Sequence, residues 1–124
     1  MPLCTPLFDP FTLIPVIWSG LAPRWERADH GVPVADISDR LLFTMALETV
    51  RAVEEGVVTS TADANVGSIF ALGFAPASGG TLQFVNAYGL PEFVSRAEYL
   101  AERYGEQFAV PALLRDRAAR GEEF

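Results

Sequence analysis

Residues 40–80 read RLLFTMALETVRAVEEGVVTSTADANVGSIFALGFAPASGG, and this stretch decides the fold class. Apolar residues recur at helical spacing in its first part, which predicts an amphipathic helix over residues 37–55. Ser60, with Asp63 three residues later, resembles a capping box and predicts a second helix that runs to about residue 72. The glycine- and proline-rich segment that closes the stretch predicts a sharp turn.

The sequence beyond this turn continues the helical pattern. Apolar positions predict a third helix over residues 81–88, a fourth from about Pro91 to Gly105, and a last helix that begins at Pro111. Proline is tolerated in the first turn of a helix, and glycine closes a helix at little conformational cost. Because no convincing strand is found, the sequence predicts an all-α domain of five helices over residues 36–124.

The helical periodicity also predicts which side chains face inward. Asp36 is placed to cap the first turn of the first helix, where a negative charge suits the helix dipole. In the second helix, Val66 and Phe70 are expected to point inward. The predicted core comprises Leu42, Met45, Val50, Val53, Ile69, Phe70, Leu82, Val85, Phe93, Val94 and Leu100.

Residues 1–35 differ from the rest in composition. Five prolines fall within the first 23 residues, and because proline fixes φ and removes a donor, an irregular arm with a polar linker is expected. The most apolar run, residues 11–22, is too short to span a bilayer and contains Pro15. No basic segment precedes it, so the sequence predicts a cytoplasmic protein without a secretory signal or membrane contact.

Charge and cysteine content restrict the partners and the compartment. The chain has a formal charge of −7, with sixteen acidic residues, nine arginines and no lysine. Such a balance repels nucleic-acid backbones and anionic lipid, so neither is an expected partner. Cys4 is the single cysteine, and because it cannot form an intramolecular disulfide, a reducing compartment is expected.

Three groups of residues could carry chemistry, and each has a simpler explanation. His30 is the only histidine and has no evident partner for acid–base work or zinc binding. Ser78 precedes two glycines, but the Gly-x-Ser-x-Gly pattern of a nucleophile elbow is absent. Glu48, Glu54 and Glu55 lack the further ligands of a metal site. No Gly-x-Gly-x-x-Gly turn exists either, so no cofactor and no metal are predicted.

Several consecutive segments resemble a known family. They read ALETVRAVEEGVV (46–58), STADANVGSIFALGF (60–74), LQFVNAYGLPEFV (82–94) and AERYGEQFAVPALLRDRAARGEEF (101–124). In this order they resemble the last helical domain of the 3-hydroxyacyl-CoA dehydrogenases, in particular of the multifunctional fatty-acid β-oxidation α-subunits. The resemblance implies a helical fold like the C-terminal domain of 6-phosphogluconate dehydrogenase.

The resemblance also implies a function. In the family, a His–Glu pair on a separate nucleotide-binding domain carries the redox chemistry, so the present sequence is expected to be a non-catalytic helical module. Asp39 or a neighbour stands where the family's positioning Asn would be sought, and no catalytic role is carried onto it. A homodimer or a separately encoded dehydrogenase domain is the expected partner. Two alternatives are the helical half of a split NAD-dependent 3-hydroxyacyl-CoA dehydrogenase and an acyl-CoA-binding module.

The corner Gly79-Gly80-Thr81 is the candidate ligand contact. Free amides at a helix start can hold an anion, and the family's ligand carries phosphates, which implies a contact with an anion or with CoA. A P-loop is excluded because Gly80 stands where that motif needs a lysine. The alternative is that these glycines allow two helices to approach closely.

Overall fold

The structure is a computed structural model, and it describes residues 31–124. Five α-helices make up most of this part of the chain. In chain order they are α2 (Val34–Glu54), α3 (Thr61–Leu72), α4 (Thr81–Tyr88), α5 (Leu90–Tyr104) and α6 (Ala112–Arg120). Two short 3₁₀ helices, η1 (Pro76–Ser78) and η2 (Glu106–Phe108), lie in the connections. Residues 31–124 contain no strand, so the predicted all-α class is confirmed for them.

Several predictions concern residues outside this range. The irregular arm, the apolar run at 11–22, Cys4 and His30 all lie outside the described residues. The domain boundary near residue 35 and the named helical fold stay predictions. Among residues 31–124, no helix combines the length and the apolar character that crossing a membrane requires.

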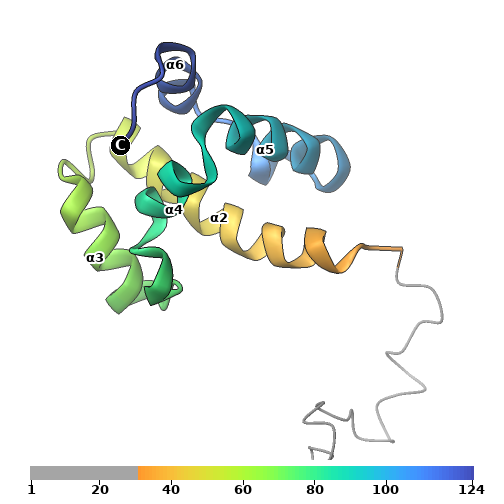
Figure 1. Cartoon of the computed structure of the whole chain (residues 1–124), viewed down its shortest axis with the longest axis horizontal. Helices are drawn as coiled ribbons and strands as arrows, with labels where there is room; N and C mark the ends of the chain where they lie inside the picture. Colours follow the sequence, from red (N-terminus) through yellow and green to blue (C-terminus); the bar gives the residue numbers. More distant parts are fainter. Residues whose placement is uncertain (1–30) are drawn as a thin grey trace, which may run out of the picture. The chain divides into compact units, whose positions relative to one another are not determined.

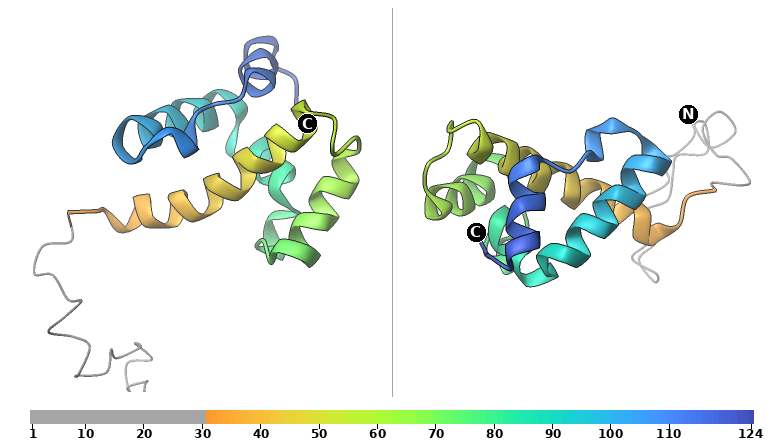
Figure 2. Two further views of the ribbon diagram at one scale, coloured as in Figure 1. Left: turned by 180° about the vertical axis from the view of Figure 1, so that it is seen from behind. Right: turned by 90° about the horizontal axis from the view of Figure 1, so that it is seen from above.

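The longest helix, α2, is the element around which the others are arranged. Figure 1 shows α3 and α4 beside α2 at one flank, while α5 and α6 lie at the other, and the two views of Figure 2 agree. α4 packs against both α2 and α3, and α5 packs against α6 and η2. α3 has little direct contact with α2, so α4 is what attaches α3 to the rest of the domain.

The first helix differs from its prediction at its start. α2 begins at Val34, directly after Pro33, and no side chain caps it. The prediction that Asp36 is a capping residue is therefore wrong. Asp36 lies inside the first turn, and its carboxylate accepts hydrogen bonds from side chains of α5. The reason is that Pro33, whose φ is already close to helical values, can precede the helix without a side-chain cap.

The other helix boundaries follow the local sequence. Ser60 Oγ accepts a hydrogen bond of 3.3 Å from the Asp63 amide, so the predicted cap of α3 is confirmed. α4 covers the predicted residues 81–88. Pro91 lies in the first turn of α5, and α6 begins directly after Pro111.

The predicted core is correct in part. Full burial is confirmed for Val50, Leu82, Val85, Phe93 and Leu100. Partial burial is found for Leu42, Met45, Val53, Ile69 and Val94. Phe70 is 85% exposed and Val66 is 56% exposed, so the prediction that they point inward is wrong. Because α3 is apolar around most of its circumference, its sequence did not reveal which side meets α4.

The centre of the core is an aromatic cluster that the sequence did not reveal. Phe43 of α2 is fully buried, and its ring stacks on that of Phe93 with centroids 4.0 Å apart and planes 2° from parallel. Tyr88 and Phe84 present ring edges to Phe43 at 5.3 Å and 6.1 Å between centroids. These contacts join α2, α4 and α5, and aromatic pairs of this kind add to the free energy gained by burial alone.

Candidate interface between α2 and α3

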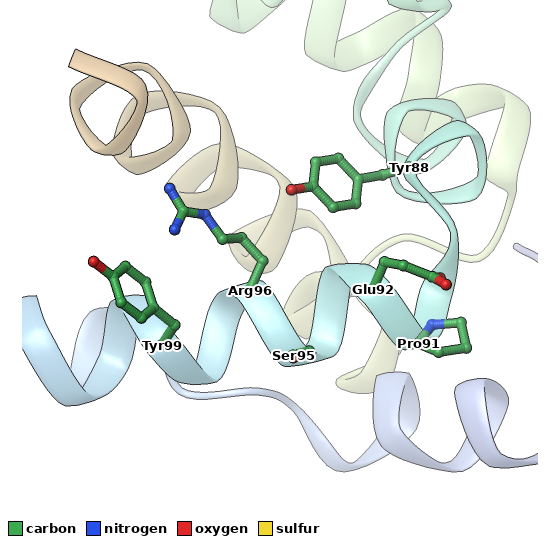
Figure 3. A pocket seen from close by; sticks show the side chains of 6 residues that line it. All are labelled: Tyr88, Pro91, Glu92, Ser95, Arg96 and Tyr99. Carbon is green, nitrogen blue, oxygen red and sulfur yellow. The ribbon is translucent and has the colours of Figure 1, made fainter. Parts of the chain in front are cut away.

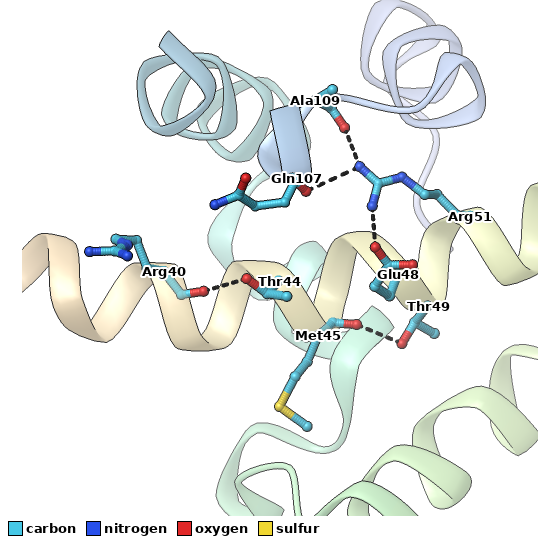
Figure 4. Close-up of polar contacts among 8 residues, drawn as sticks. All are labelled: Arg40, Thr44, Met45, Glu48, Thr49, Arg51, Gln107 and Ala109. Atoms are coloured by element: carbon cyan, nitrogen blue, oxygen red, sulfur yellow. Dashed lines mark hydrogen bonds and ion pairs between the residues drawn. The ribbon is translucent and has the colours of Figure 1, made fainter. Parts of the chain in front are cut away.

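A groove separates α2 from α3. Its volume is about 610 Å³, and apolar atoms form most of its walls. We call it the α2–α3 groove and define it by Met45, Glu48 and Ala52 on one side and by Ala64, Gly67 and Ala71 on the other. Figure 4 shows that Met45 and Thr49 project from one side of α2, whereas Arg51 projects from the opposite side.

Small side chains keep the groove open. A Cβ added to Gly67 would meet no heavy atom within 4 Å, so the surface of α3 at this residue faces open space. Helices with small facing residues usually pack closely, but here α3 has little direct contact with α2. The space between the two helices is therefore available to another group.

Two polar side chains of α3 explain its position. Asn65 Oδ1 accepts hydrogen bonds from the amides of Leu82 and Gln83, at 2.9 and 3.1 Å. Ser68 Oγ accepts one from the amide of Thr81 at 3.1 Å. These side chains cap α4, whose own preceding residue is a glycine, and they turn α3 toward α4. The sequence analysis missed both residues, although two polar positions three apart in an apolar helix could have signalled them.

The predicted anion contact at Gly79, Gly80 and Thr81 lies at this same start of α4. A Cβ at Gly80 would come within 2.5 Å of the Asn65 Cα, so close approach of two helices accounts for that glycine. An anion would compete with Asn65 and Ser68 for the amides. The anion contact therefore stays a prediction, and these two side chains are its competitors.

The other candidate residues take part in ordinary structural contacts. Ser78 Oγ donates a hydrogen bond of 2.6 Å to the Ala75 carbonyl. Glu48 pairs with Arg51, and Glu54 accepts a hydrogen bond of 2.8 Å from the Leu113 amide. Within residues 31–124, no three His, Cys, Asp or Glu side chains gather as they would to hold a metal ion.

Large apolar side chains are exposed on α2 and on α3. On α2, Val34 is 82% exposed and Leu41 is 68% exposed, and because they are seven residues apart they share one side of the helix. On α3, Phe70 and Leu72 are exposed as well. Of these residues, Leu72 lines the groove, and exposed apolar groups of this size are typical of interaction surfaces.

A buried polar cluster fixes the start of α2 on α5. Asp36 is only 3% exposed, and its carboxylate accepts hydrogen bonds from Arg96 Nη2 and Tyr104 Oη, both at 2.6 Å, and from Tyr99 Oη at 3.2 Å. Arg96 also donates from Nε to Asp39 at 2.7 Å. Asp39 is thus a structural partner of Arg96.

The same contacts shift the pKa values of Asp36 and Tyr104. The hydrogen bond from Tyr104 lowers the pKa of Asp36 most, burial opposes this change, and the bonds from Arg96 and Tyr99 lower it further. The hydrogen bond to Asp36 in turn raises the pKa of Tyr104. Because the pKa of Asp36 is lower in the folded than in the unfolded chain, its ionised form stabilises the fold.

Acid should therefore weaken the domain through Asp36. The stabilisation is present above the unfolded-state pKa and is lost as the pH falls through the lower folded-state pKa. Tyr104→Phe removes the strongest of these hydrogen bonds and should raise the folded-state pKa of Asp36, so the loss on acidification should be smaller and should be complete at higher pH. In Asp36→Asn, the free energy of unfolding should be lower at neutral pH and should fall less on acidification. Urea unfolding at a series of pH values checks this, and identical pH profiles for all three proteins would contradict it.

A second cavity lies along α5 and reaches Tyr88 of α4. It measures about 490 Å³ and is lined by Tyr88, Glu92, Arg96 and Tyr99 among others. Figure 3 shows Arg96 extending from α5 toward α2 between the two tyrosines. The Arg96 guanidinium is already bonded to Asp36 and Asp39, so its charge is largely neutralised within the fold. The α2–α3 groove is the stronger candidate for an interaction.

Comparison with known proteins identifies relatives of the chain. No family model matches the sequence. The fatty acid oxidation complex subunit alpha of Vibrio vulnificus (strain CMCP6) is 37% identical over 104 residues, which cover 84% of this chain and 14% of that protein. The subunits alpha of Shewanella amazonensis and of Pseudomonas syringae pv. syringae are 36% and 39% identical over 94 and 89 residues.

These matches cover most of the present chain but only a small part of each relative. They cover 72–84% of this chain, but only 12–14% of each relative. They confirm the resemblance to the multifunctional β-oxidation α-subunits that the sequence segments predicted. The chain is therefore a relative of the fatty acid oxidation complex subunit alpha, matching one segment of that protein and not its whole length.

Proposed function

We propose that the chain is a non-catalytic helical module of a fatty-acid oxidation system and that it acts in assembly through the α2–α3 groove. The relatives support the metabolic setting, since they are named as subunits of a fatty acid oxidation complex. A cytoplasmic location, expected from the sequence, belongs to this proposal. The partner is a second copy or a separately encoded dehydrogenase domain.

The groove is the observation that carries the assembly role. It is apolar, it is about 610 Å³ in volume, and the exposed side chain of Leu72 forms part of its wall. Interfaces between proteins combine an apolar centre with a polar rim, and Glu48 and Asp63 form polar parts of this rim. The groove adds nothing to the packing of the domain itself, so its apolar surface is better explained by contact with another molecule.

The alternative of an acyl-CoA-binding module fits the groove less well. An acyl chain could lie along its apolar walls, but among the described residues that line the groove the charged ones are Glu48 and Asp63, and none is a cation. Acidic groups repel the phosphates of CoA. The split-enzyme alternative uses the same groove for a dehydrogenase domain, and it differs in predicting NAD-linked turnover once that domain is present.

Three measurements on the purified chain test the proposal. We expect no NADH formation from a 3-hydroxyacyl-CoA with NAD, no saturable heat on titration with acetoacetyl-CoA, and an associated species in sedimentation velocity at micromolar concentration. Turnover by the chain alone would refute the non-catalytic assignment. Saturable heat would favour the acyl-CoA-binding module instead.

A further inference from the structure

A smaller cavity, of about 300 Å³, lies between the N-terminal half of α2 and η2. We call it the α2–η2 cavity. It is lined by one cation, two uncharged polar residues and three apolar ones, which are Arg40, Thr44, Gln107, Ile37, Leu41 and Phe108. Ile37 and Leu41 are 47% and 68% exposed, whereas Phe108 is buried in the core. A ligand in this cavity would therefore remove apolar surface from water, which favours binding.

The charge of Arg40 is not compensated within the fold. Within residues 31–124, four other arginines form ion pairs with carboxylates, but Arg40 forms none. The acidic residues closest to it in the sequence, Asp36 and Asp39, are both bonded to Arg96. The Arg40 guanidinium is therefore available to an anion from outside the chain.

Tyr104 holds the Arg40 guanidinium in place. The guanidinium carbon lies 4.5 Å from the centroid of the Tyr104 ring, and this ring is fixed because its hydroxyl donates a hydrogen bond of 2.6 Å to Asp36. Stacking occupies a face of the guanidinium and leaves the N–H groups on its edge, which match the two oxygens of a carboxylate. Arg103 also approaches the ring, at 5.9 Å, and adds positive charge nearby.

Gln107 offers a further donor at the same cavity. Its Nε2 donates a hydrogen bond of 3.0 Å to the Tyr104 carbonyl, and an amide nitrogen carries a second N–H that this bond does not use. Figure 4 shows the Gln107 side chain extending from η2 toward the stretch of α2 that carries Arg40. Among the described residues that line the α2–η2 cavity none is acidic, whereas Glu48 and Asp63 line the α2–α3 groove. An anion is therefore favoured in the cavity and disfavoured in the groove.

The α2–η2 cavity is suited to an amphipathic monoanion. One uncompensated guanidinium matches one carboxylate, whereas the phosphates of nucleic acid or of CoA carry more charge and require several cations. The apolar walls match an aliphatic chain. Because the volume is at the lower end of the range for small-molecule sites, we expect a chain of about six to eight carbons.

From these observations we propose that the α2–η2 cavity binds an aliphatic monocarboxylate, with the carboxylate on Arg40 and the carbon chain along Ile37 and Leu41. This inference goes beyond the proposed assembly function and does not depend on it. The cavity and the α2–α3 groove share only Thr44 among the described residues that line them, so the two sites can be tested separately.

An NMR titration of the full chain with octanoate tests this site. Saturable changes are expected in the amide signals of Leu41, Gln107 and Phe108, with a dissociation constant of about 0.1–1 mM for a ligand of this size. Octanamide has the same chain without the charge and should bind at least about tenfold more weakly. Acetate has the charge without the chain, so it should cause no saturable change at the concentrations at which octanoate saturates.

Variants assign the binding energy to particular side chains. Arg40→Gln removes the cation and should raise the octanoate dissociation constant at least about tenfold. Arg40→Lys keeps the charge but loses the stacked, forked donor and should raise it about three- to fivefold. Leu41→Ser removes an apolar wall and should raise it about three- to tenfold.

Arg120→Gln is the matched control for Arg40→Gln. It changes the net charge by the same amount, but Arg120 does not line the cavity and is paired with Glu122. The octanoate dissociation constant should therefore stay within about twofold of that of the unmodified chain. Circular dichroism on every variant confirms that the helices persist, which separates loss of binding from loss of the fold.

Four results would overturn the inference. Absence of saturable changes with octanoate would refute the site. Equal affinity for octanoate and octanamide, or equal affinity in Arg40→Gln and the unmodified chain, would refute the role of Arg40. Changes confined to Ala64, Gly67 and Ala71 would place the ligand in the α2–α3 groove instead. N-acetyl-leucine resembles the carboxyl end of a polypeptide and should bind more weakly than octanoate, so tighter binding would refute a free acid as the ligand.

The failure of this inference and the failure of the proposed function are distinguishable. Sedimentation velocity, NADH formation and titration with acetoacetyl-CoA test the proposed function, and none of them reports on a monocarboxylate in the α2–η2 cavity. A chain that associates but does not bind octanoate would refute only this inference. A monomeric chain that binds octanoate through Arg40 would support this inference.

Discussion

Replacement of Gly80 by alanine is expected to reduce the free energy of unfolding by at least about 3 kcal/mol. The new Cβ would lie 2.5 Å from the Cα of Asn65, and because this is a backbone atom, no change of rotamer can relieve the overlap. Gly80 also has φ of 108° and ψ of 175°, a region essentially restricted to glycine. Since a domain of this kind has about 5–15 kcal/mol of stability in total, the variant should unfold at a clearly lower urea concentration than the unmodified chain.

Gly73→Ala is the control for this prediction. Gly73 also has a positive φ, of 71°, but a Cβ there would meet nothing within 4 Å. Its replacement should cost only the left-handed backbone strain, about 1–2 kcal/mol. Urea unfolding of both variants therefore separates steric overlap from strain. Equal losses of stability would show that the contact between α3 and α4 is looser than described, and rescue of Gly80→Ala by Asn65→Ala would show the same.

Phe43→Ala should cost about 3–5 kcal/mol, the range for truncating a buried aromatic residue. The Phe43 ring is fully buried, stacked on Phe93 and in edge contact with Phe84 and Tyr88. Its removal leaves a cavity where α2, α4 and α5 meet. Because each of these helices also packs against other elements, they can move only slightly to fill the cavity. Thermal and urea unfolding measure the loss.

Phe70→Ala provides the comparison for this second variant. Phe70 has the same side chain but is 85% exposed, so its truncation should change the stability of the monomer by less than about 0.5 kcal/mol. The two variants are compared at concentrations below the onset of association, because an exposed apolar side chain such as Phe70 can contribute to contacts between chains. Similar losses in both would contradict the assignment of Phe43 to the core and of Phe70 to the surface.

Local sequence determined the number, type and most boundaries of the helices. Ser60, Pro91 and Pro111 mark helix starts through interactions within one turn, and such interactions do not depend on the rest of the fold. The relationship to the fatty acid oxidation complex subunit alpha was also visible in the sequence, since it lies in the order of several short segments.

Only the tertiary structure decided which side of each helix is buried. Residues 41–47 of α2 are apolar at nearly every position, so helical spacing allowed either Leu42 or Phe43 to face the core, and packing against α4 and α5 selected Phe43. Likewise, Asn65 and Ser68 turned α3 toward α4 and left Phe70 in solvent. Periodicity gives the angles between side chains on one helix, but the direction in which that helix faces depends on contacts with distant segments. The α2–α3 groove, which arises from that choice, could not be derived from the sequence.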